Sequence, residues 1–276
     1  MLFGGRESKK SCYLFSPSSQ QWTRLPDLPT ERCSHNALKI SNSIFLIGGR
    51  GNNTIEQYKV SSKTFKVVAT MKKCLTNFAI SLYNNQSLLI TGGVNELTVI
   101  RDCILFDTSS KQFKNLPSMN IIRMGHVLVN VGGIIYAIGG WNDKDNSLNF
   151  IEEFHQSTEE WQTSTLELQI ARSGHQAVAH KHFIYVFGGE CKNDLLTSTI
   201  EKINTETKRV EIIATKLLVE RTEFAVAKVG EKIHILGGST VYKKTDSVEI
   251  FDLNTEQIEQ GVKMPIKNAH FSACVL

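Results

Sequence analysis

Short apolar runs separated by polar turns recur along the whole chain, and the clearest example lies within residues 123–161. An apolar run leads to a glycine turn at 131–133, and a second run at 134–138 ends at the glycine doublet 139–140. Two apolar runs that flank a glycine turn are typical of a β-hairpin. A polar loop separates them from a third alternating segment at 151–154. The pattern therefore predicts short antiparallel strands.

The same order of signals recurs along the sequence, and the glycine doublets mark it. They lie at residues 4–5, 48–49, 92–93, 139–140, 188–189 and 237–238, at intervals of 44, 44, 47, 49 and 49. A repeat of this length built from short strands indicates a propeller or a similar array. No linker interrupts the repeat, so we predict a single domain over residues 1–276.

Each repeat divides into four predicted strands, which we name A to D. Strand B is the apolar run before the doublet. Strand A follows an Arg-x-x-His pattern, at 32–35, 123–126 and 172–175. Strand C carries a large apolar residue, and another such residue opens strand D seven positions later. These pairs are Phe15 and Trp22, Tyr58 and Phe65, Phe106 and Phe113, Phe154 and Trp161, Ile203 and Val210, and Phe251 and Ile258. We expect them to pack between adjacent sheets.

Together these residues resemble the kelch repeat, and the resemblance covers essentially the whole chain in six copies. It implies an all-β fold, a six-bladed kelch β-propeller with four antiparallel strands in each blade. The sequence departs from the kelch pattern at four of the six tryptophan positions, which hold Phe, Val or Ile, and the second repeat lacks both Arg and His.

The two ends of the sequence fall inside predicted strands. The chain begins in a strand B and ends in a strand A, so pairing of the C-terminal strand with the N-terminal strands would close the first blade. Starting in the middle of a blade also suggests a domain cut from a longer polypeptide.

Composition narrows the class of protein. A hydrophobic content of 41% with 21% charged residues is typical of a globular protein. The net charge of +4, without runs of like charge, argues against a nucleic-acid or membrane surface. No signal segment precedes the repeats, so we expect a cytoplasmic protein. The six cysteines have no zinc-site spacing, and we expect reduced, mostly buried thiols.

Motifs for catalysis are missing from the sequence, which has no HExxH, Gly-x-Ser-x-Gly, phosphate loop or dinucleotide fingerprint. We therefore predict a protein that is not an enzyme and that has no cofactor and no metal site. His35, His126 and His175 share one repeat position, which favours a structural role. Because some kelch-type propellers are enzymes, an enzyme site at the channel mouth remains an alternative.

Arginines of strand A are the first candidates for partner binding. In a kelch propeller the D–A and B–C loops open on one face, so Arg32, Arg123, Arg172 and Arg221 should approach one another around a central channel. Converging guanidinium groups would favour an acidic peptide through bidentate bonds. This hypothesis expects that alanine at Arg123 and Arg172 abolishes binding without lowering thermal stability. Alternatively, each arginine braces its own blade by bonding loop carbonyls.

The B–C loops vary while the strands stay similar, and specificity commonly lies in such loops. The candidate partner-binding residues there are Arg50, Asn52, Trp141, Asn142, Lys192 and Tyr242. Trp141 and Tyr242 are candidate anchors, because aromatic residues dominate interface hot spots. Packing on a neighbouring loop is the alternative for both.

Phrases such as Arg-Ser-Gly-His-Gln-Ala-Val and Val-Glu-Ile-Phe-Asp resemble the kelch-like family with BTB domains. The resemblance implies a module that binds a peptide segment or degron of a partner protein and recruits it to a cullin-RING ubiquitin ligase. In that family BTB and BACK segments contact the cullin, and these 276 residues contain neither. Binding of actin or the cytoskeleton, which other kelch proteins perform, is the alternative.

Overall fold

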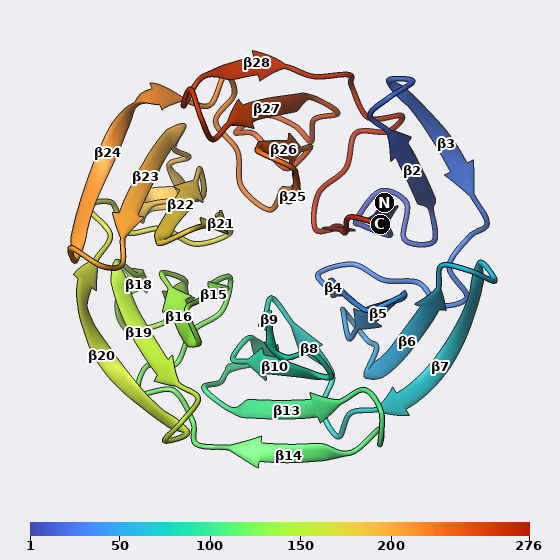
Figure 1. Ribbon diagram of the computed structural model, residues 1–276, viewed down its shortest axis with the longest axis horizontal. Coiled ribbons are helices and arrows are strands. Elements are labelled where there is room, and N and C mark those ends of the chain that lie inside the picture. Colours follow the sequence, from blue (N-terminus) through green and yellow to red (C-terminus); the bar gives the residue numbers. More distant parts are fainter. The chain divides into compact units, whose positions relative to one another are not determined.

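The computed structural model describes residues 1–276, and almost every regular element in it is a β-strand. One short 3-10 helix, η1 (Lys192–Asp194), is the exception. The chain divides into two compact units, unit 1 (residues 1–76 and 223–276) and unit 2 (residues 77–222). Each unit contains three four-stranded antiparallel sheets (Figure 1). The all-β fold and the four-stranded repeat that the sequence predicted are therefore confirmed.

Unit 1 combines the two ends of the sequence with the first complete repeat. Its first sheet has the order β29-β1-β2-β3, its second β4-β5-β6-β7 and its third β25-β26-β27-β28. The strands of the first are β1 (Leu2–Phe3), β2 (Cys12–Ser16), β3 (Gln21–Leu25) and β29 (Ser272–Ala273). The second has β4 (Asn36–Ile40), β5 (Ser43–Ile47), β6 (Thr54–Lys59) and β7 (Thr64–Thr70). The third has β25 (Ala225–Val229), β26 (Lys232–Leu236), β27 (Val248–Asp252) and β28 (Ile258–Gln260); β8 (Leu75–Thr76) ends the first segment of the unit.

Unit 2 holds the three central repeats. Its sheets have the orders β9-β10-β13-β14, β15-β16-β19-β20 and β21-β22-β23-β24. The first has β9 (Ala79–Asn84), β10 (Ser87–Thr91), β13 (Cys103–Asp107) and β14 (Phe113–Leu116). The second has β15 (Val127–Val131), β16 (Ile134–Ile138), β19 (Phe150–His155) and β20 (Glu160–Glu167). The third has β21 (Gln176–His180), β22 (Phe183–Phe187), β23 (Thr199–Asn204) and β24 (Arg209–Lys216). Two small hairpins, β11 (Val94–Asn95) with β12 (Thr98–Val99) and β17 (Trp141–Asn142) with β18 (Asn146–Ser147), extend the B–C loops.

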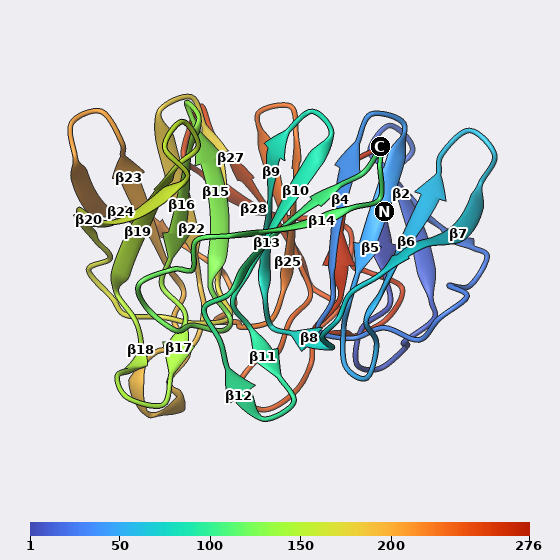
Figure 2. The ribbon, with the colours of Figure 1, turned by 90° about the horizontal axis from the view of Figure 1, so that it is seen from below.

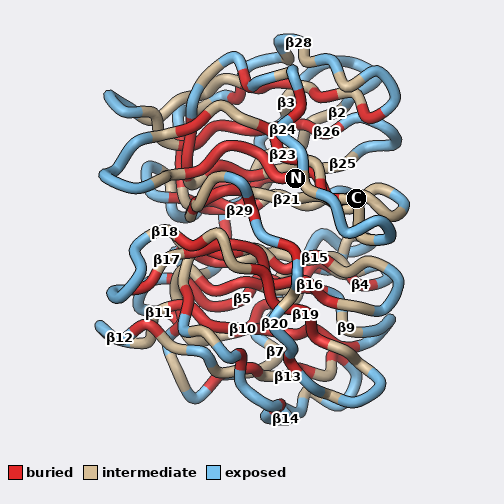
Figure 3. The backbone as a smooth tube through the Cα atoms, turned by 90° about the vertical axis from the view of Figure 1, so that its left-hand side faces the viewer, coloured by how far each residue is buried: buried red, intermediate tan, exposed pale blue.

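Strand B is the most deeply buried strand of each sheet, because it has a neighbouring strand on both sides and apolar residues on both faces. Four residues of β16, from Ile135 to Ile138, are no more than 2% exposed, and β22 has the same pattern. In each unit the buried residues follow these strands and the exposed residues follow the loops (Figure 3). Full burial of one such apolar side chain contributes about 1.5–3 kcal/mol.

Neighbouring sheets of one unit share their apolar cores. One cluster in unit 2 joins Leu89 of β10 to Ile135 of β16 and Phe154 of β19. In unit 1, Phe3 of β1 packs in one cluster with Ile44 and Leu46 of β5. A four-stranded sheet alone could not bury these faces, so each sheet depends on the next.

The residue pairs seven apart are directly opposite one another on strands C and D. Phe154 pairs with Trp161 in register, with ring centroids 5.0 Å apart, and Tyr58 pairs with Phe65 at 4.7 Å. All six predicted pairs occupy this register position. Trp161 also donates a hydrogen bond from Nε1 to the carbonyl of Pro117, 3.1 Å away, which directly follows strand β14 of the preceding sheet. The pairs therefore stabilise both the C–D hairpin and the packing between sheets.

The doublet at Gly139 and Gly140 shows why glycine is needed there. Gly139 has φ 58°, and a β-carbon on it would lie 2.7 Å from the carbonyl oxygen of Arg172. Gly140 has φ 106°, and a β-carbon there would lie 2.9 Å from the Met124 oxygen. Its own N–H donates to the Arg172 carbonyl at 2.9 Å. The close approach of two sheets therefore excludes any side chain at these positions.

The C-terminal strand pairs with the N-terminal strands within unit 1, as the sequence pattern indicated. Strand β29 lies antiparallel to β1, with Leu2 opposite Ala273 and Phe3 opposite Ser272. The sheet thereby gains its strand A from the far end of the sequence. Closure of all six sheets into a ring, and a single domain over residues 1–276, stay predictions.

Candidate functional site

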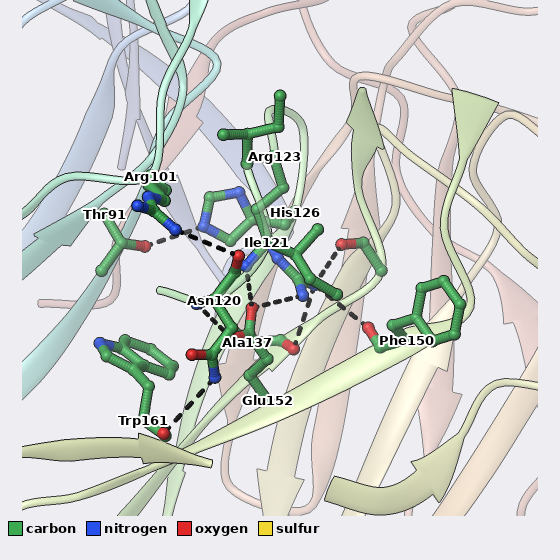
Figure 4. A network of polar contacts seen from close by, with 12 residues as sticks. Thr91, Arg101, Asn120, Ile121, Arg123, His126, Ala137, Phe150, Glu152 and Trp161 are labelled. Atoms are coloured by element: carbon green, nitrogen blue, oxygen red, sulfur yellow. Dashed lines mark hydrogen bonds and ion pairs between the residues drawn. The ribbon is translucent and has the colours of Figure 1, made fainter. Parts of the chain in front are cut away.

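The strand-A arginines are completely buried, and their contacts are internal. Arg123 donates from Nη1 to the carbonyls of Gly139 (2.7 Å) and Phe150 (3.1 Å), and from Nη2 to Glu152 Oε2 (2.7 Å) (Figure 4). Glu152 also accepts the N–H of Asn120 at 2.6 Å. Gly139 begins the B–C loop and Phe150 ends it. One guanidinium group therefore ties together the two stems of this loop.

Two other arginines repeat this arrangement. Arg172 bonds the carbonyls of Gly188 (2.8 Å) and Thr199 (3.2 Å) and forms an ion pair with Glu201 (2.6 Å). Arg32 bonds Gly48 (2.7 Å) and Thr54 (3.2 Å) and pairs with Glu56 (3.2 Å). We call this arrangement the arginine clamp: a buried arginine bonded to both stems of a B–C loop and to a glutamate on strand C.

The expectation of direct partner contact does not hold for the four arginines, because Arg32, Arg123, Arg172 and Arg221 are all 0% exposed. A side chain without exposed surface cannot touch a partner. In the three clamps a glutamate also neutralises the charge that was expected to attract an acidic peptide. Burial lowers the pKa of Arg123, and the neighbouring Glu152 opposes that shift. The alternative, that each arginine braces its own blade, accounts for the hydrogen bonds of Arg32, Arg123 and Arg172 to loop carbonyls.

The strand-A histidines are buried as well. His126 Nε2 lies 2.8 Å from Thr91 Oγ1, and His35 Nε2 lies 2.8 Å from Ser272 Oγ. Burial lowers the pKa of His35 to about 3, and the nearby positive charge of Arg32 adds a smaller effect in the same direction. Burial likewise lowers the pKa of His175 to about 3, with a smaller contribution from Arg172. Burial also holds the pKa of His126 well below its usual value. These side chains are neutral at physiological pH and belong to the packing of the strand-A starts.

Two of the predicted loop residues build their own loops. Asn52 is 7% exposed, and its Oδ1 accepts from the N–H and the hydroxyl of Thr54, each at 2.8 Å. Asn142 is 2% exposed, and its Oδ1 accepts from the N–H groups of Lys144 (3.0 Å) and Asp145 (2.7 Å). Their Oδ1 atoms are used inside the loop, while Nδ2 of Asn52 is buried without a hydrogen-bond partner and Nδ2 of Asn142 donates to the Ile122 carbonyl at 3.2 Å. Both side chains are buried, so the prediction that Asn52 and Asn142 contact a partner is corrected.

The other predicted loop residues reach the surface. Arg50 and Lys192 are exposed, Trp141 is half-buried, and Tyr242 is 93% exposed. The backbone of Trp141 forms a two-way bridge with Met124, which fixes this residue at the start of its loop. Only these four of the ten predicted residues have side chains that a partner could touch.

Sequence reasoning missed a set of apolar side chains at the tips of the B–C loops. Leu97, in the turn between β11 and β12, is 98% exposed, and Leu195, next to η1, is 64% exposed. Val241, beside Tyr242 in unit 1, is 64% exposed. The signal for Leu97 was a single apolar residue inside an otherwise polar stretch, Asn95-Glu96-Leu97-Thr98, whereas Leu195 and Val241 each begin a pair of apolar residues in a polar loop.

In an antiparallel four-stranded sheet the B–C connection lies at the end opposite the A–B and C–D turns, so each loop tip lies at that end of its own sheet. In unit 2 the hairpins β11–β12 and β17–β18 both extend from that end (Figure 2). Leu97, Trp141 and Leu195 come from three consecutive loops of this unit. Exposed leucines at loop tips are unfavourable in water, and such residues are typical of interaction surfaces. The loops of the B–C end are therefore the candidate site.

Comparisons with known proteins agree with this repeat architecture. The family model described as the KLHDC2/KLHL20/DRC7 Kelch-repeats domain matches residues 125–276. A solved structure, described as the structure of YjhT, superimposes with a TM-score of 0.80 at 13% identity, covering 91% of this chain and 89% of that one. At that identity the likeness concerns the fold alone.

Several curated proteins are similar in sequence. Kelch-like protein 36 of Bos taurus is 24% identical over 99% of this chain and 38% of its own length. Kelch-like protein 40 of Xenopus tropicalis is 25% identical over 62% of this chain and 31% of its own length. Alpha-scruin of Limulus polyphemus is 27% identical over 59% of this chain and 19% of its own length. The chain thus spans about a third of the kelch-like proteins and a fifth of alpha-scruin.

Proposed function

Because the chain belongs to the kelch-repeat family, we propose that it is a protein-interaction module that is not an enzyme and that binds a segment of a partner protein at the B–C loop end. The observation that carries this proposal is the exposed apolar loop tips of each unit, Leu97 and Leu195 in unit 2, and Val241 and Tyr242 in unit 1. Burial of a few such anchors provides most of the free energy in protein interfaces. The other proposed contact residues are Trp141 and Lys192 in unit 2 and Arg50 in unit 1.

Replacement of the loop tips tests this proposal. Partners captured with the wild-type chain are identified by mass spectrometry, and their affinities are then measured for the Leu97→Ser, Leu195→Ser double variant and for Tyr242→Ser. We expect at least one of them to weaken binding about tenfold or more, since hot-spot side chains contribute about 2 kcal/mol each. The melting temperature should stay unchanged, because these side chains are exposed.

Ile212→Ser is the matched control, since Ile212 is an exposed apolar residue on strand β24, 38% exposed, away from the loop tips. This variant should bind like the wild type. Equal binding by all the loop-tip variants would move the site elsewhere.

The proposed biological role is substrate recognition for a cullin-RING ubiquitin ligase adaptor in the cytoplasm. The similarity to kelch-like proteins 36 and 40 supports it, together with the resemblance to BTB-kelch proteins. No helix of the structure is long and apolar enough to cross a membrane. Recovery of a cullin with the chain in its full-length polypeptide is the expected result.

The match to alpha-scruin keeps the cytoskeletal alternative open, since the kelch resemblance also implies actin binding for some members. Co-sedimentation with filamentous actin distinguishes the two roles. Pelleting of the chain with actin, and no cullin in the captured material, would favour the alternative. Metal analysis of the purified chain tests the alternative that the protein is an enzyme. About one bound transition metal per chain would support that alternative.

We further propose that the six sheets form one domain and close as a six-bladed ring, with β29 completing the first blade. The pairing of β29 with β1 within unit 1 supports this closure. Deletion of residues 268–276 should lower the melting temperature by about 5 °C or more, because β1 loses its neighbour and apolar edges become exposed. Deletion of residues 275–276 alone, which lie beyond β29, is the control and should change it little. An unchanged melting temperature for the longer deletion would contradict closure.

A further inference from the structure

One position of the D–A loops links neighbouring sheets through the main chain. It is the residue before the histidine of the Arg-x-x-His pattern, or before the phenylalanine that replaces this histidine in the other three repeats (Phe78, Phe224 and Phe271). This residue has positive φ in all six repeats. Its occupants are Ser34 (φ 53°), Asn77 (51°), Gly125 (60°), Gly174 (59°), Glu223 (54°) and His270 (55°). In unit 1 the N–H of Ser34 donates to the His270 carbonyl (2.9 Å), and that of His270 to the Glu223 carbonyl (3.0 Å). Unit 2 repeats this with Gly125 donating to Asn77 and Gly174 to Gly125.

Glycine is the residue that fits this position best. The left-handed conformation brings a β-carbon too close to the following carbonyl in any other residue, and only Asn and Asp tolerate it readily. Gly125 and Gly174 meet the requirement in unit 2. In unit 1 the same position is occupied by Ser34, Glu223 and His270, whose left-handed conformation costs stability. The main-chain bonds do not need these side chains, because the glycines form the same bonds.

The three side chains of unit 1 meet. His270 Nδ1 lies 3.1 Å from Glu223 Oε2 and 3.2 Å from Ser34 Oγ. A carboxylate only accepts hydrogen bonds, so the proton of a neutral imidazole lies on Nδ1 and Nε2 is left as an acceptor. The second oxygen of Glu223 is a further acceptor. The side chains of His270 and Glu223 are 18% and 28% exposed, so both can be reached from solvent.

This inference rests on the proposed function and names the chemistry of its partner. We propose that Glu223, His270 and Ser34 form an acceptor site that binds a lysine or arginine side chain of the partner segment. The carboxylate of Glu223, which His270 Nδ1 holds in place and which solvent reaches, suits a group that carries several N–H donors and a positive charge. The buried arginines, by contrast, cannot bind an acidic partner, because their side chains are unexposed.

The exposed charges on the neighbouring loops are mixed. The N–H of Arg6 bonds Ala269, and that of Arg50 bonds Cys33, so both arginines stand on loops beside the acceptor site. Glu7 is already paired with Lys244. Arg6 and Arg50 would favour an acidic ligand, whereas the acceptor site would favour a basic one. The charge of the bound peptide therefore shows which of the two dominates binding.

Selection from a displayed library of random peptides tests this, with the chain as the target. We expect peptides selected on the wild type to be enriched in lysine and arginine. Glu223→Gly should reduce binding of those peptides at least tenfold, yet raise the melting temperature by about 2 °C because the left-handed strain is removed. Glu223→Lys should enrich acidic residues instead. A side chain with only a structural role would not give a variant that is more stable and binds less.

Glu256→Gly is the matched control, since Glu256 is also a glutamate of unit 1 with φ 54°, in the turn after β27. It should show the same rise in melting temperature with unchanged peptide binding. A different result is a set of peptides that depend on Tyr242, Leu97 or Leu195, show no preference for lysine or arginine, and bind the Glu223→Gly variant as well as the wild type. That result would overturn the acceptor site but not the proposed function. Enrichment of acidic residues on the wild type would do the same. Failure to select any peptide on the wild type would overturn the proposed function as well.

Discussion

At the level of single residues, the arginine clamp carries most of the charge that the protein buries. Each clamp places a guanidinium group and a carboxylate out of water, and the desolvation of both is offset by the ion pair, by the carbonyl bonds of the arginine and by further hydrogen bonds to the carboxylate. Arg123 has three such bonds besides Glu152, to Ala137, Gly139 and Phe150. Removal of one partner therefore leaves a buried charge that has lost its ion pair.

Arg123→Ala should lower the free energy of unfolding by about 3–5 kcal/mol, because Glu152 is left buried and unpaired. This reverses the expectation from the sequence that alanine here would leave stability unchanged. Urea denaturation checks it, with Arg50→Ala as the control, since Arg50 is exposed and should change stability by less than about 0.5 kcal/mol. Equal stability of the two variants would argue against the clamp.

Among the elements, the C–D hairpins show which features the sequence could predict. The spacing of seven identified Phe154 and Trp161 as partners, because a short hairpin places residues at that separation opposite one another. The doublets likewise marked the ends of the B strands. The sequence could not distinguish a buried arginine from an exposed one, because burial depends on Glu152, which lies 29 residues farther along the chain. Leu97 was missed because one apolar residue in a loop has no periodicity.

Phe154→Ala should destabilise the protein by about 3–5 kcal/mol, because Phe154 is 0% exposed and its loss leaves a cavity between two sheets of unit 2. Phe113, on β14, is 37% exposed and provides the comparison. Phe113→Ala should cost clearly less. Chemical denaturation of both variants measures the difference, and equal losses would show that burial between sheets does not set the cost.

For the whole molecule, stability should depend on pH through the buried histidines. In the unfolded chain a histidine has a pKa of about 6.5. In the folded protein burial lowers the pKa of His35 and His175 to about 3. The unfolded state therefore binds more protons between these values, and stability is lost as the pH falls below about 6.5. At pH 5 each of these histidines accounts for about 2 kcal/mol of lost stability.

His175→Phe should make the loss between pH 7 and pH 5 smaller by about 2 kcal/mol. Phenylalanine fits this position, because Phe78, Phe224 and Phe271 are its buried counterparts in other repeats. Urea denaturation at the two pH values gives the comparison. The same loss in the variant and in the wild type would show that His175 is protonated in the folded state.

The clamps also separate the loops from the framework that carries them. Gly48 and Thr54 are held by one arginine across a short connection, while Gly139 and Phe150 are held in the same way across a longer one. Since the two stems are held by the clamp, a foreign sequence could be grafted in place of residues 143–146, the exposed turn of the longer loop, without redesign of the sheets. The same independence would let natural selection replace one loop at a time, so that new partners arise on an unchanged support.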